Sequence, residues 1–251
     1  MWAARRRLLY LSTLLFFIGI IAIYIYSAYF YKEPTCFDNI LNQNEEGIDC
    51  GGTCDKVCPF RATTPNILWS RALEIAPGVY NLIAKVENPN FDFRMTGGYI
   101  FKAYSSDNIL VEEVINDIEL DPSQVKLVLE PAVNVKEKEI TRVFFEFLEK
   151  REWDVHEPTQ NSIKVVSRVL EDEETSPKLR VTLENTSLKP IRDVKVLVAI
   201  YNKDEVVIQT SSSFEEYFDR DQVIEKIFTW QNPFGQDVAR IEVFIEEDIF
   251  K

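Results

Sequence analysis

The chain has 251 residues, of which 46% are hydrophobic and 27% are charged, with only 8 glycines. This composition excludes a disordered chain, because it holds enough apolar side chain to offset the entropy of ordering the backbone. The formal net charge of −13 argues against nucleic acid as a partner, since a protein that binds nucleic acid needs a basic surface.

An apolar segment without charged side chains extends from Leu8 to Tyr31, directly after arginines at positions 5 to 7. About 24 residues at about 1.5 Å each make a helix of roughly 36 Å, which can cross about 30 Å of hydrocarbon with some tilt. Three basic residues precede the span, whereas Lys32 is the one basic residue directly after it. The positive-inside rule therefore predicts residues 1–7 in the cytoplasm and residues 33–251 outside. We therefore expect a single-pass protein of the cell membrane, held in the lipid bilayer through residues 8–31.

A cleaved signal peptide is the alternative for this segment. The apolar core of a signal peptide covers only about 7 to 15 residues before a cleavage site with small residues. Cleavage after Ala28 would place Tyr26 where a small residue is needed, and the sequence before Cys36 is not a lipoprotein cleavage box. Aromatic side chains near both ends of the segment match those that gather at lipid headgroups. The sequence therefore favours a retained anchor.

All four cysteines lie in a short stretch after the span, residues 32–62, which we call the cysteine module; they are Cys36, Cys50, Cys54 and Cys58. Thiols outside a membrane are not kept reduced, and two disulfides would brace a segment too small to have its own core. Four thiolates could instead bind structural zinc, but such sites usually combine two close pairs, and Cys36 is far from the others. We predict two disulfides, with all three pairings open.

Oxygen-bearing side chains at alternate positions of this module resemble the first half of a calcium-binding EF-hand loop. The candidate ligands are Asp38, Asn42, Asn44, Glu46 and Asp49. The match fails at the twelfth position, where Thr53 replaces the glutamate that would bind calcium through both oxygens. A polar, turn-rich connection explains the same pattern, so calcium is an alternative and no cofactor is predicted.

The cysteine spacing resembles a short module that recurs in surface proteins of uncultivated small-genome bacteria and some other prokaryotes. Its pattern is C-x-D-G-x-x-N-x-x-E-x-G-x-D-C-G-G-x-C-x-x-C, and its most specific part is present here as Asp49-Cys50-Gly51-Gly52. The chain departs from the pattern at Asn39, where glycine is usual, and by three residues instead of two before Cys58. The resemblance implies an extracytoplasmic stalk or spacer.

The rest of the chain contains a repeat at an offset of 97 residues (167 − 70 = 97). The matching segments are Ser70 to Glu74 with Ser167 to Glu171, Val86-Glu87-Asn88 with Leu183-Glu184-Asn185, and Tyr104 with Tyr201. Near the ends of the copies, Arg142 to Glu146 resembles Arg240 to Phe244 with one added residue (240 − 142 = 98). Self-similarity at a fixed period indicates a duplicated structural unit. We predict two copies of one domain, at residues 63–150 and 160–251, joined by a linker at residues 151–159.

Alternating apolar and polar residues, with frequent β-branched and aromatic side chains, predict strands in both copies. Turn residues such as Asn88-Pro89-Asn90 recur every 8–16 residues or so and predict hairpins. The predicted fold class is therefore all-β, with two tandem immunoglobulin-like antiparallel β-sandwiches of about seven strands each. We interpret the following aromatic residues as core: Trp69, Tyr80, Phe101, Tyr104, Tyr201, Phe228 and Trp230.

The second copy is similar to the FxLYD domain of prokaryotic cell-envelope proteins. The similarity rests on Leu183 to Ser187, Ile191 to Val196 and Ala199 to Val207. The first copy, with Val86 to Asn90, also resembles the late-embryogenesis-abundant type 2 sandwich. These resemblances imply that the asparagine caps a turn and that the tyrosine packs in the core. They imply no catalytic residue.

A search for catalytic chemistry finds no assembled motif. His156, the only histidine, lies in the predicted linker as a solvated residue, whereas hydrolysis by serine or cysteine needs a base beside the nucleophile. The sequence has no glycine-rich phosphate loop and no zinc-protease motif. Adjacent acids such as Glu112-Glu113 and Glu215-Glu216 point to opposite faces of a strand. We therefore predict no enzyme and no catalytic residue.

These observations predict a non-enzymatic surface protein that binds another envelope or surface protein in cell-envelope assembly or adhesion. Exposed edge strands suit this role, because a partner strand can pair with them without a dedicated pocket. The alternative function is a sensor module, in which calcium at residues 38–49 or a small solute between the domains changes their relative angle.

Overall fold

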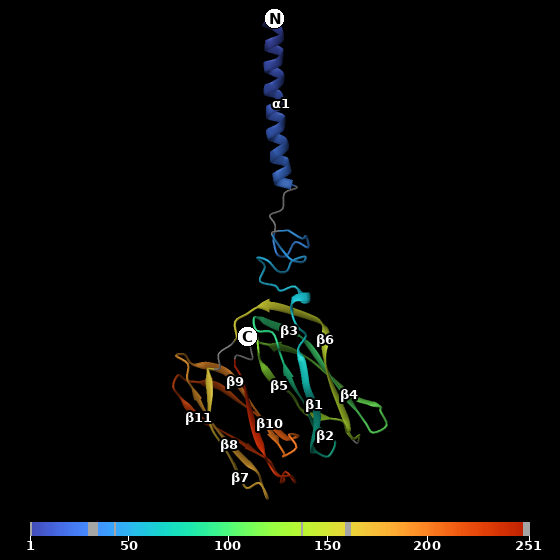
Figure 1. Cartoon of the computed structure of the whole chain (residues 1–251), viewed down its shortest axis with the longest axis vertical. Coiled ribbons are helices and arrows are strands. Elements are labelled where there is room, and N and C mark those ends of the chain that lie inside the picture. Colours follow the sequence, from blue (N-terminus) through green and yellow to red (C-terminus); the bar gives the residue numbers. More distant parts are fainter. Residues whose placement is uncertain (1, 30–34, 43, 137, 159–161, 248–251) are drawn as a thin grey trace. The chain divides into compact units, whose positions relative to one another are not determined.

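The computed structural model describes residues 2–29, 35–42, 44–136, 138–158 and 162–247 (Figure 1). The chain divides into two compact units, Met1–Cys58 and Pro59–Lys251. The first unit holds an N-terminal helix and most of the cysteine module. The second unit holds both predicted copies of the repeat, so the copies form one body rather than two separate ones.

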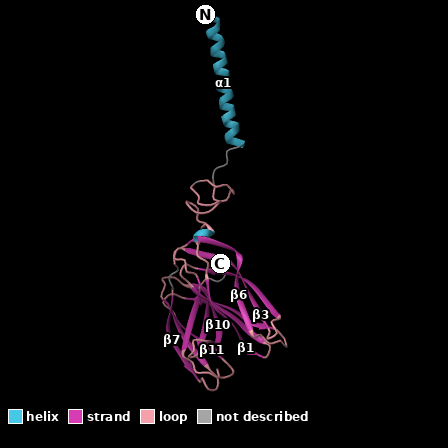
Figure 2. Cartoon of the chain, turned by 45° about the vertical axis from the view of Figure 1, so that its right-hand side comes forward, coloured by secondary structure: helices cyan, strands magenta, loops and turns pink. Residues whose placement is uncertain are grey.

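The first unit begins with α1, Trp2–Tyr29, the long helix at the N-terminus in Figures 1 and 2. Its segment Arg5–Ala28 has a mean hydropathy of 2.5 and is long and apolar enough to cross a membrane. The large apolar side chains of the helix are exposed within the structure. An apolar helix is therefore confirmed at the predicted place, while the last two residues of the predicted span lie outside the described residues.

Apart from the short helix η1, every helix or strand among the described residues of the second unit is a β-strand, and the strands appear in magenta in Figure 2. The predicted all-β class is thus confirmed. The elements are η1 Pro59–Arg61, β1 Asn66–Ala76, β2 Val79–Glu87, β3 Phe93–Tyr104, β4 Leu110–Leu120, β5 Val125–Asn134, β6 Arg142–Val155, β7 Ile163–Glu171, β8 Lys178–Asn185, β9 Ile191–Tyr201, β10 Val207–Phe218, β11 Val223–Thr229 and β12 Arg240–Glu246.

Each predicted copy folds as a sandwich of two antiparallel three-stranded sheets. In the first copy, sandwich 1, the strand orders are β1-β2-β5 and β4-β3-β6. In the second copy, sandwich 2, the orders are β7-β8-β11 and β10-β9-β12. The two topologies are the same when β7 to β12 replace β1 to β6. Two tandem sandwiches of one strand order therefore follow the apolar helix in the chain.

Each sandwich has six strands among the described residues, so the expectation of about seven is wrong. The strands are longer than the turn spacing suggested, with 12 residues in β3 and β10 and 14 in β6. β6 continues to Val155, which lies opposite Phe93 at the start of β3. Strand structure therefore occupies residues 151–155, which the sequence analysis assigned to a linker.

A fully buried asparagine occupies the same place in both sandwiches, at the end of β2 and of β8. The Nδ2 group of Asn88 donates to three backbone carbonyls at 2.8 to 3.0 Å, those of Phe93, Leu120 and Asp121. The Nδ2 group of Asn185 donates at 3.0 Å to the carbonyls of Lys189, Phe218 and Asp219. Each amide thus ties the two sheets of its sandwich together at one end.

The first strands of the two sandwiches are out of register with the sequence repeat. When the buried asparagines are taken as equivalent, Lys85 of β2 corresponds to Thr182 of β8 (182 − 85 = 97). Trp69 lies opposite Lys85 and Ser167 lies opposite Thr182, each just after a bulge. Ser167 therefore corresponds to Trp69 (167 − 69 = 98) and not to Ser70. A shift of one residue reverses the direction of every side chain in a strand, so the match between Ser70 to Glu74 and Ser167 to Glu171 is wrong in space.

Most of the aromatic residues that were interpreted as core are buried. Phe101 and Phe228 lie inside the two sandwiches, and Tyr80 and Tyr201 are also buried. Trp69, Tyr104 and Trp230 are only half-buried. Tyr104 and Tyr201 both end the third strand of their sandwich, but Tyr201 is buried by sandwich 1 rather than by its own core. The tyrosine prediction was therefore correct about burial in one copy only.

Candidate functional site

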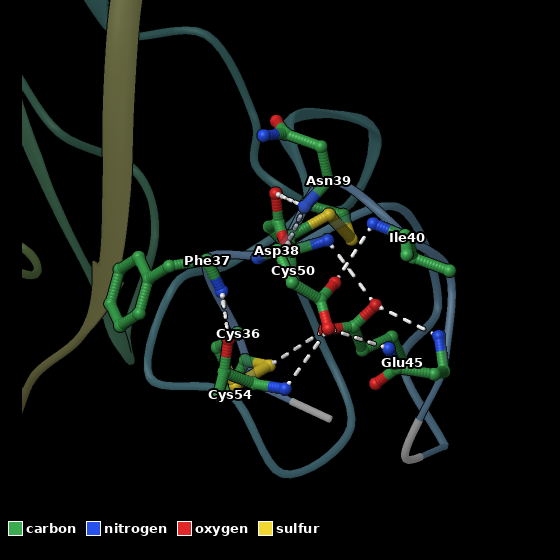
Figure 3. The surroundings of a disulfide bond; sticks show 12 residues. Cys36, Phe37, Asp38, Asn39, Ile40, Glu45, Cys50 and Cys54 are labelled. Atoms are coloured by element: carbon green, nitrogen blue, oxygen red, sulfur yellow. Dashed lines mark hydrogen bonds between the residues drawn. A yellow bond between two sulfur atoms is a disulfide. The ribbon is translucent and has the colours of Figure 1, made fainter. Parts of the chain in front are cut away.

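Two disulfides hold the cysteine module (Figure 3). Cys36 pairs with Cys54 at a Cα–Cα distance of 5.7 Å, and Cys50 pairs with Cys58 at 5.0 Å. The disulfide prediction is confirmed, and one of the three open pairings is selected. Because so short a segment has little apolar core, the cross-links stabilise it mainly by restricting its unfolded state.

A pair of glycines makes the sharp turn between the cysteines of the module. Gly51 and Gly52 have φ angles of +74° and +61°, in the left-handed region of the backbone that residues other than glycine rarely adopt. A Cβ atom on Gly52 would lie 2.0 Å from the carbonyl oxygen of Asn44. Gly52 is therefore required by the close approach of two backbone segments, which gives the Asp-Cys-Gly-Gly sequence a structural reason.

The carboxylates of the module accept hydrogen bonds from its own backbone, and Figure 3 shows Asp38 and Glu45 directed into the loop. The Oδ1 atom of Asp49 accepts from the backbone N–H of Asp38 at 3.0 Å. Glu45 Oε2 accepts from the backbone N–H groups of Asn42 and Asp49 at 3.2 and 3.3 Å. Asp38 accepts from the backbone of Ile40 and from Asn42 Nδ2, both at 2.9 Å. These acids hold the turns of the loop in place.

The structure brings together three of the five candidate calcium ligands. Asp38, Asn42 and Asp49 lie in one hydrogen-bonded group, whereas Asn44 and Glu46 are exposed residues on the following turn. Calcium binding would have to break the hydrogen bonds that the two aspartates already accept from backbone N–H groups. The loop geometry thus agrees with a polar, turn-rich connection, which is the other interpretation that the sequence analysis gave for this pattern.

One cluster of three side chains that could in principle bind a metal is found in the part of the chain that the structure describes. It consists of Cys36, Glu45 and Cys54, whose ligand atoms lie within 4.8 Å of one another. The two sulfurs are bonded to each other, so neither is the thiolate that a zinc ion requires. The cluster is therefore a disulfide beside a carboxylate.

His156 is half-buried and hydrogen-bonded, in contrast to the solvated linker residue that we expected. Its Nε2 atom faces Nη2 of Arg94, and its backbone N–H donates to the carbonyl of Asp92 at 2.9 Å. Arg94 also donates from Nε to Asp121 at 2.6 Å. These contacts fasten the chain after β6 to the start of β3, so the histidine has a structural role.

The two adjacent acidic pairs lie on edge strands, Glu112-Glu113 on β4 and Glu215-Glu216 on β10. Glu215 binds Lys226 of β11 at 2.6 Å. Acids next to each other on a strand face opposite sides of the sheet, so neither pair brings two carboxylates onto one substrate. Both pairs are surface features of the sandwiches.

The two sandwiches pack face to face within the second unit. The outer face of sheet β1-β2-β5 meets the outer face of sheet β10-β9-β12, which makes a stack of four three-stranded sheets. The apolar residues buried there are Ile83, Leu127 and Leu129 from sandwich 1 and Leu197, Ala199, Tyr201 and Val207 from sandwich 2. The rings of Trp69 and Tyr201 meet edge to face, with centroids 6.2 Å apart. We call this contact the sandwich interface.

The central strands of the two inner sheets are buried on both faces. β2 has five consecutive buried residues, Tyr80 to Ala84, and β9 has six, Val196 to Tyr201. A strand with one solvated face alternates, whereas a strand covered on both faces is a near-continuous run of apolar residues. β9 follows this rule from Val196 to Tyr201, and β2 follows it except at Asn81, whose Oδ1 accepts from the backbone N–H of Ala132 at 3.1 Å. These runs are the signal of the sandwich interface, which the sequence analysis missed because it treated them as half-buried strands.

A polar cluster lies inside the sandwich interface. Lys85 of β2 binds Glu242 of β12, with Nζ 2.8 Å from Oε2. The hydroxyl of Tyr201 donates to the same carboxylate at 2.7 Å. Arg240 also pairs with Glu242, and its guanidinium lies 4.0 Å from the centre of the Tyr201 ring. Glu242 therefore accepts hydrogen bonds from both sandwiches.

The cluster shifts the pKa values of both of its acids. Burial raises the pKa of Glu242, but the hydrogen bonds from Lys85 and Tyr201 outweigh it, so the pKa lies below its ordinary value of 4.5. Burial, and after it the bond to Glu242, raises the pKa of Tyr201 above its ordinary value of 10.0. At neutral pH the carboxylate is thus ionised and the phenol is protonated, as their hydrogen bond requires.

We expect acid to weaken the sandwich interface. The pKa of Glu242 is lower in the folded than in the unfolded chain, so its contribution to stability is complete above the unfolded value of 4.5 and is lost as the pH falls through the folded value. Urea unfolding of the full chain at falling pH, with Glu242→Gln as the matched variant, measures this loss. The wild type should lose more stability than the variant below that pH, and equal losses would contradict the assignment.

A groove with a volume of about 1450 Å³ runs along the side of the stack where β5 and β12 form sheet edges. It is lined by β3, β4 and β5 of sandwich 1 and by β7 and β12 of sandwich 2. Lys126 of β5 pairs with Glu246 of β12 across the groove, at 3.3 Å. This groove is where a solute between the sandwiches would bind.

No family model and no curated protein matches the chain. Among solved structures, similar chains include red sea bream transglutaminase, with 8% identity over 75% of this chain and a TM-score of 0.23, and a β-glucuronidase from glycoside hydrolase family 2, with 10% identity over 80% and a TM-score of 0.24. This chain covers 30% and 25% of their lengths. The tandem CBM22 domain of Paenibacillus barcinonensis Xyn10C has 6% identity and a TM-score of 0.16, with 74% of this chain and 91% of that chain covered. Similarity at this level carries no argument about fold or function.

Proposed function

We propose that this chain is a single-pass membrane protein that holds a rigid pair of β-sandwiches outside the cytoplasm to bind other proteins of the cell envelope. The observation that carries the proposal is the order of the parts along the chain. An apolar helix able to cross a membrane is followed by a disulfide-braced module and then by two sandwiches in one compact unit. This order suits an anchor, a spacer and a display platform.

Two features support an outside location for the sandwiches. Arginines at positions 5 to 7 precede the apolar helix, and cationic residues concentrate on the cytoplasmic side of a span. The cysteine module has two disulfides and no free cysteine, and disulfides persist in compartments that are not reducing. The acidic part of the chain then lies away from anionic lipid, which attracts basic surfaces instead.

The roles of the polar residues support binding rather than catalysis. The acids of the cysteine module hold turns, His156 fastens the chain after β6, and Glu242 links the two sandwiches. The sandwiches expose sheet faces and edge strands, which bind partner strands or sheets. The resemblance to FxLYD and late-embryogenesis-abundant type 2 domains implies no catalytic residue, and Asn185 serves as a structural residue that donates to the carbonyls of Lys189 and Asp219.

Crosslinking of the full-length protein in its native membrane tests the proposed function. We expect a lysine-reactive reagent to join sandwich lysines to one envelope protein in a fixed ratio, and mass spectrometry identifies the joined peptides. A set of crosslinks that is confined to the cysteine module, or that varies with the abundance of neighbouring proteins, would contradict specific binding by the sandwiches.

The groove between the sandwiches favours a sensor as the second candidate function, with calcium or a small solute as ligand. The module's aspartates already accept hydrogen bonds from backbone N–H groups. We therefore expect that neither added calcium nor its removal by a chelator changes the thermal midpoint of the full chain. Scanning calorimetry with calcium and with chelator measures this. A midpoint that rises with calcium concentration, and that Asp49→Asn abolishes, would favour the sensor instead.

A further inference from the structure

The two disulfides of the cysteine module differ in how well solvent can reach them. Cys36 is half-buried, whereas Cys54 is 6% exposed and the pair Cys50 and Cys58 is 7% and 0% exposed. A disulfide is opened when a thiolate attacks one of its two sulfur atoms, so the reaction needs access to a sulfur. A small thiol in solution therefore reaches the Cys36–Cys54 bond first, and it reaches that bond at Cys36.

The fold of the module depends on its cross-links. Among the described residues of the module, Val57 is the only buried apolar residue besides cysteine. Removing a native disulfide from a small domain with so little core often abolishes folding. The larger apolar side chains of the module are exposed; they are Phe37, Ile40, Leu41, Ile48 and Phe60. The solvent-accessible disulfide is thus the weak point of the module in the presence of thiols.

The side chain of Glu45 lies directly beside this bond (Figure 3). Its Oε1 atom is 3.4 Å from Sγ of Cys54, and a carboxylate oxygen lies within 4.8 Å of Sγ of Cys36. A disulfide sulfur carries no hydrogen, so the contact with Cys54 is not a hydrogen bond. The backbone N–H groups of Asn42 and Asp49 donate to the other oxygen, Oε2, at 3.2 and 3.3 Å, and they hold the carboxylate in this position.

The charged residues of the module are almost all acidic. Reactive cysteines lie in electropositive surroundings, which stabilise the thiolate. Residues 35–58 include one basic residue, Lys56, against five acids. The acids are Asp38, Glu45, Glu46, Asp49 and Asp55. A thiolate at Cys36 or Cys54 would therefore form in an unfavourable field, and Glu45 is the acid whose oxygen is held against the disulfide.

We propose that the carboxylate of Glu45 protects the Cys36–Cys54 bond from thiols by charge repulsion. In the exchange reaction, the sulfur of an incoming thiolate attacks Sγ of Cys36 and forms a new disulfide with it. The old bond breaks, and its electron pair leaves on Sγ of Cys54, which becomes a thiolate. Negative charge thus approaches one sulfur and develops on the other, each within 4.8 Å of a carboxylate oxygen of Glu45. Like charges about 4 Å apart repel strongly enough to slow such a step about tenfold.

Reduction of the full chain in detergent micelles by thiols of different charge tests the proposal. The probes are mercaptoethanesulfonate, mercaptoethanol and cysteamine, which are anionic, uncharged and cationic outside the thiol group. Trapping with iodoacetamide and peptide mass spectrometry give the rate at which Cys36 and Cys54 open, relative to a small uncharged disulfide. We expect Glu45→Gln to raise this rate about tenfold for the anionic thiol and least for the cationic one, because the incoming charge no longer meets a carboxylate.

Glu46→Gln is the matched control, because it removes the same charge from an exposed position one residue away. It should leave the rates almost unchanged. Glu45→Asp keeps the charge beside the disulfide and should be reduced more slowly than Glu45→Gln. Added salt should narrow the differences among the three thiols in the wild type, and this measurement needs no variant.

An equal gain for all three thiols in Glu45→Gln would mean that the loop had only loosened, and it would overturn the inference. Unchanged rates, or opening of the Cys50–Cys58 bond before the Cys36–Cys54 bond in the wild type, would contradict it as well. The inference concerns how the module stays closed and not what the sandwiches bind, so each of these outcomes leaves the proposed function standing.

Discussion

Replacing Asn185 with alanine is expected to lower the free energy of unfolding by about 3 kcal/mol. The side chain is fully buried at the end of β8, and its Nδ2 group donates to three backbone carbonyls. Alanine removes the donor and leaves buried acceptors unpaired, at a cost of about 1–3 kcal/mol for such a group. The amide also joins the two sheets of sandwich 2, so the loss should open that end of the sandwich first.

Urea unfolding of the detergent-solubilised full chain, followed by tryptophan fluorescence, measures the effect. Asn88→Ala should lower the free energy of unfolding by about as much, because Asn88 also donates to three backbone carbonyls, in sandwich 1. Asn66→Ala is the matched control, since its side chain is exposed and donates only to Glu87 at 3.1 Å. A cost for Asn185→Ala no larger than that of the control would show that the amide does not hold the sheets together.

Leu197→Ala is expected to lower the free energy of unfolding by about 2–5 kcal/mol and to weaken the support that each sandwich gives the other. Leu197 is fully buried, and it packs in the sandwich interface against residues of β2 and β5. Truncation leaves a cavity between two sheets that belong to different sandwiches. Sandwich 1 should therefore lose stability although its own sequence is unchanged.

Hydrogen exchange read by mass spectrometry separates this effect from local damage. Peptides of β2 and β5 should exchange faster in Leu197→Ala than in the wild type, because sandwich 1 loses the support of sandwich 2. The matched control is Ile227→Ala on the outer face of β11, a site that is 47% exposed and lies away from the interface. Unchanged exchange in β2 and β5 would contradict one cooperative body made of two sandwiches.

The elements with local causes were predictable from the sequence. An uncharged apolar run of about 24 residues is too long for the core of a small soluble domain, so it forms either a helix that spans the bilayer or a signal sequence. The helix α1 was therefore predictable from the length of the run. Four cysteines in a short segment implied disulfides, although their pairing depends on the folded loop. The buried asparagines were located by the repeat, because Val86-Glu87-Asn88 and Leu183-Glu184-Asn185 occupy equal places in their sandwiches.

Features that depend on packing between distant segments were not predictable in the same way. A bulge between Glu74 and Ala76 of β1, for which β7 has no counterpart among its paired residues, shifts β1 by one residue against the repeat, and the ungapped repeat could not reveal it. The sandwich interface left a trace in the apolar run from Val196 to Tyr201, but the run does not say which surface covers it. Glu242 carried no signal at all, since its partners come from β2 and β9.

Peptide mapping of the membrane-isolated protein by mass spectrometry, without reduction, tests the central claim most directly: an apolar anchor holds a disulfide-braced sandwich pair outside the cytoplasm. The account predicts an intact N-terminal peptide with residues 8–31 retained, together with peptides joined through Cys36–Cys54 and Cys50–Cys58. A mature N-terminus beyond residue 28 would show a signal peptide in place of an anchor. Free thiols at all four cysteines would place the module in a reducing compartment and contradict the proposed topology.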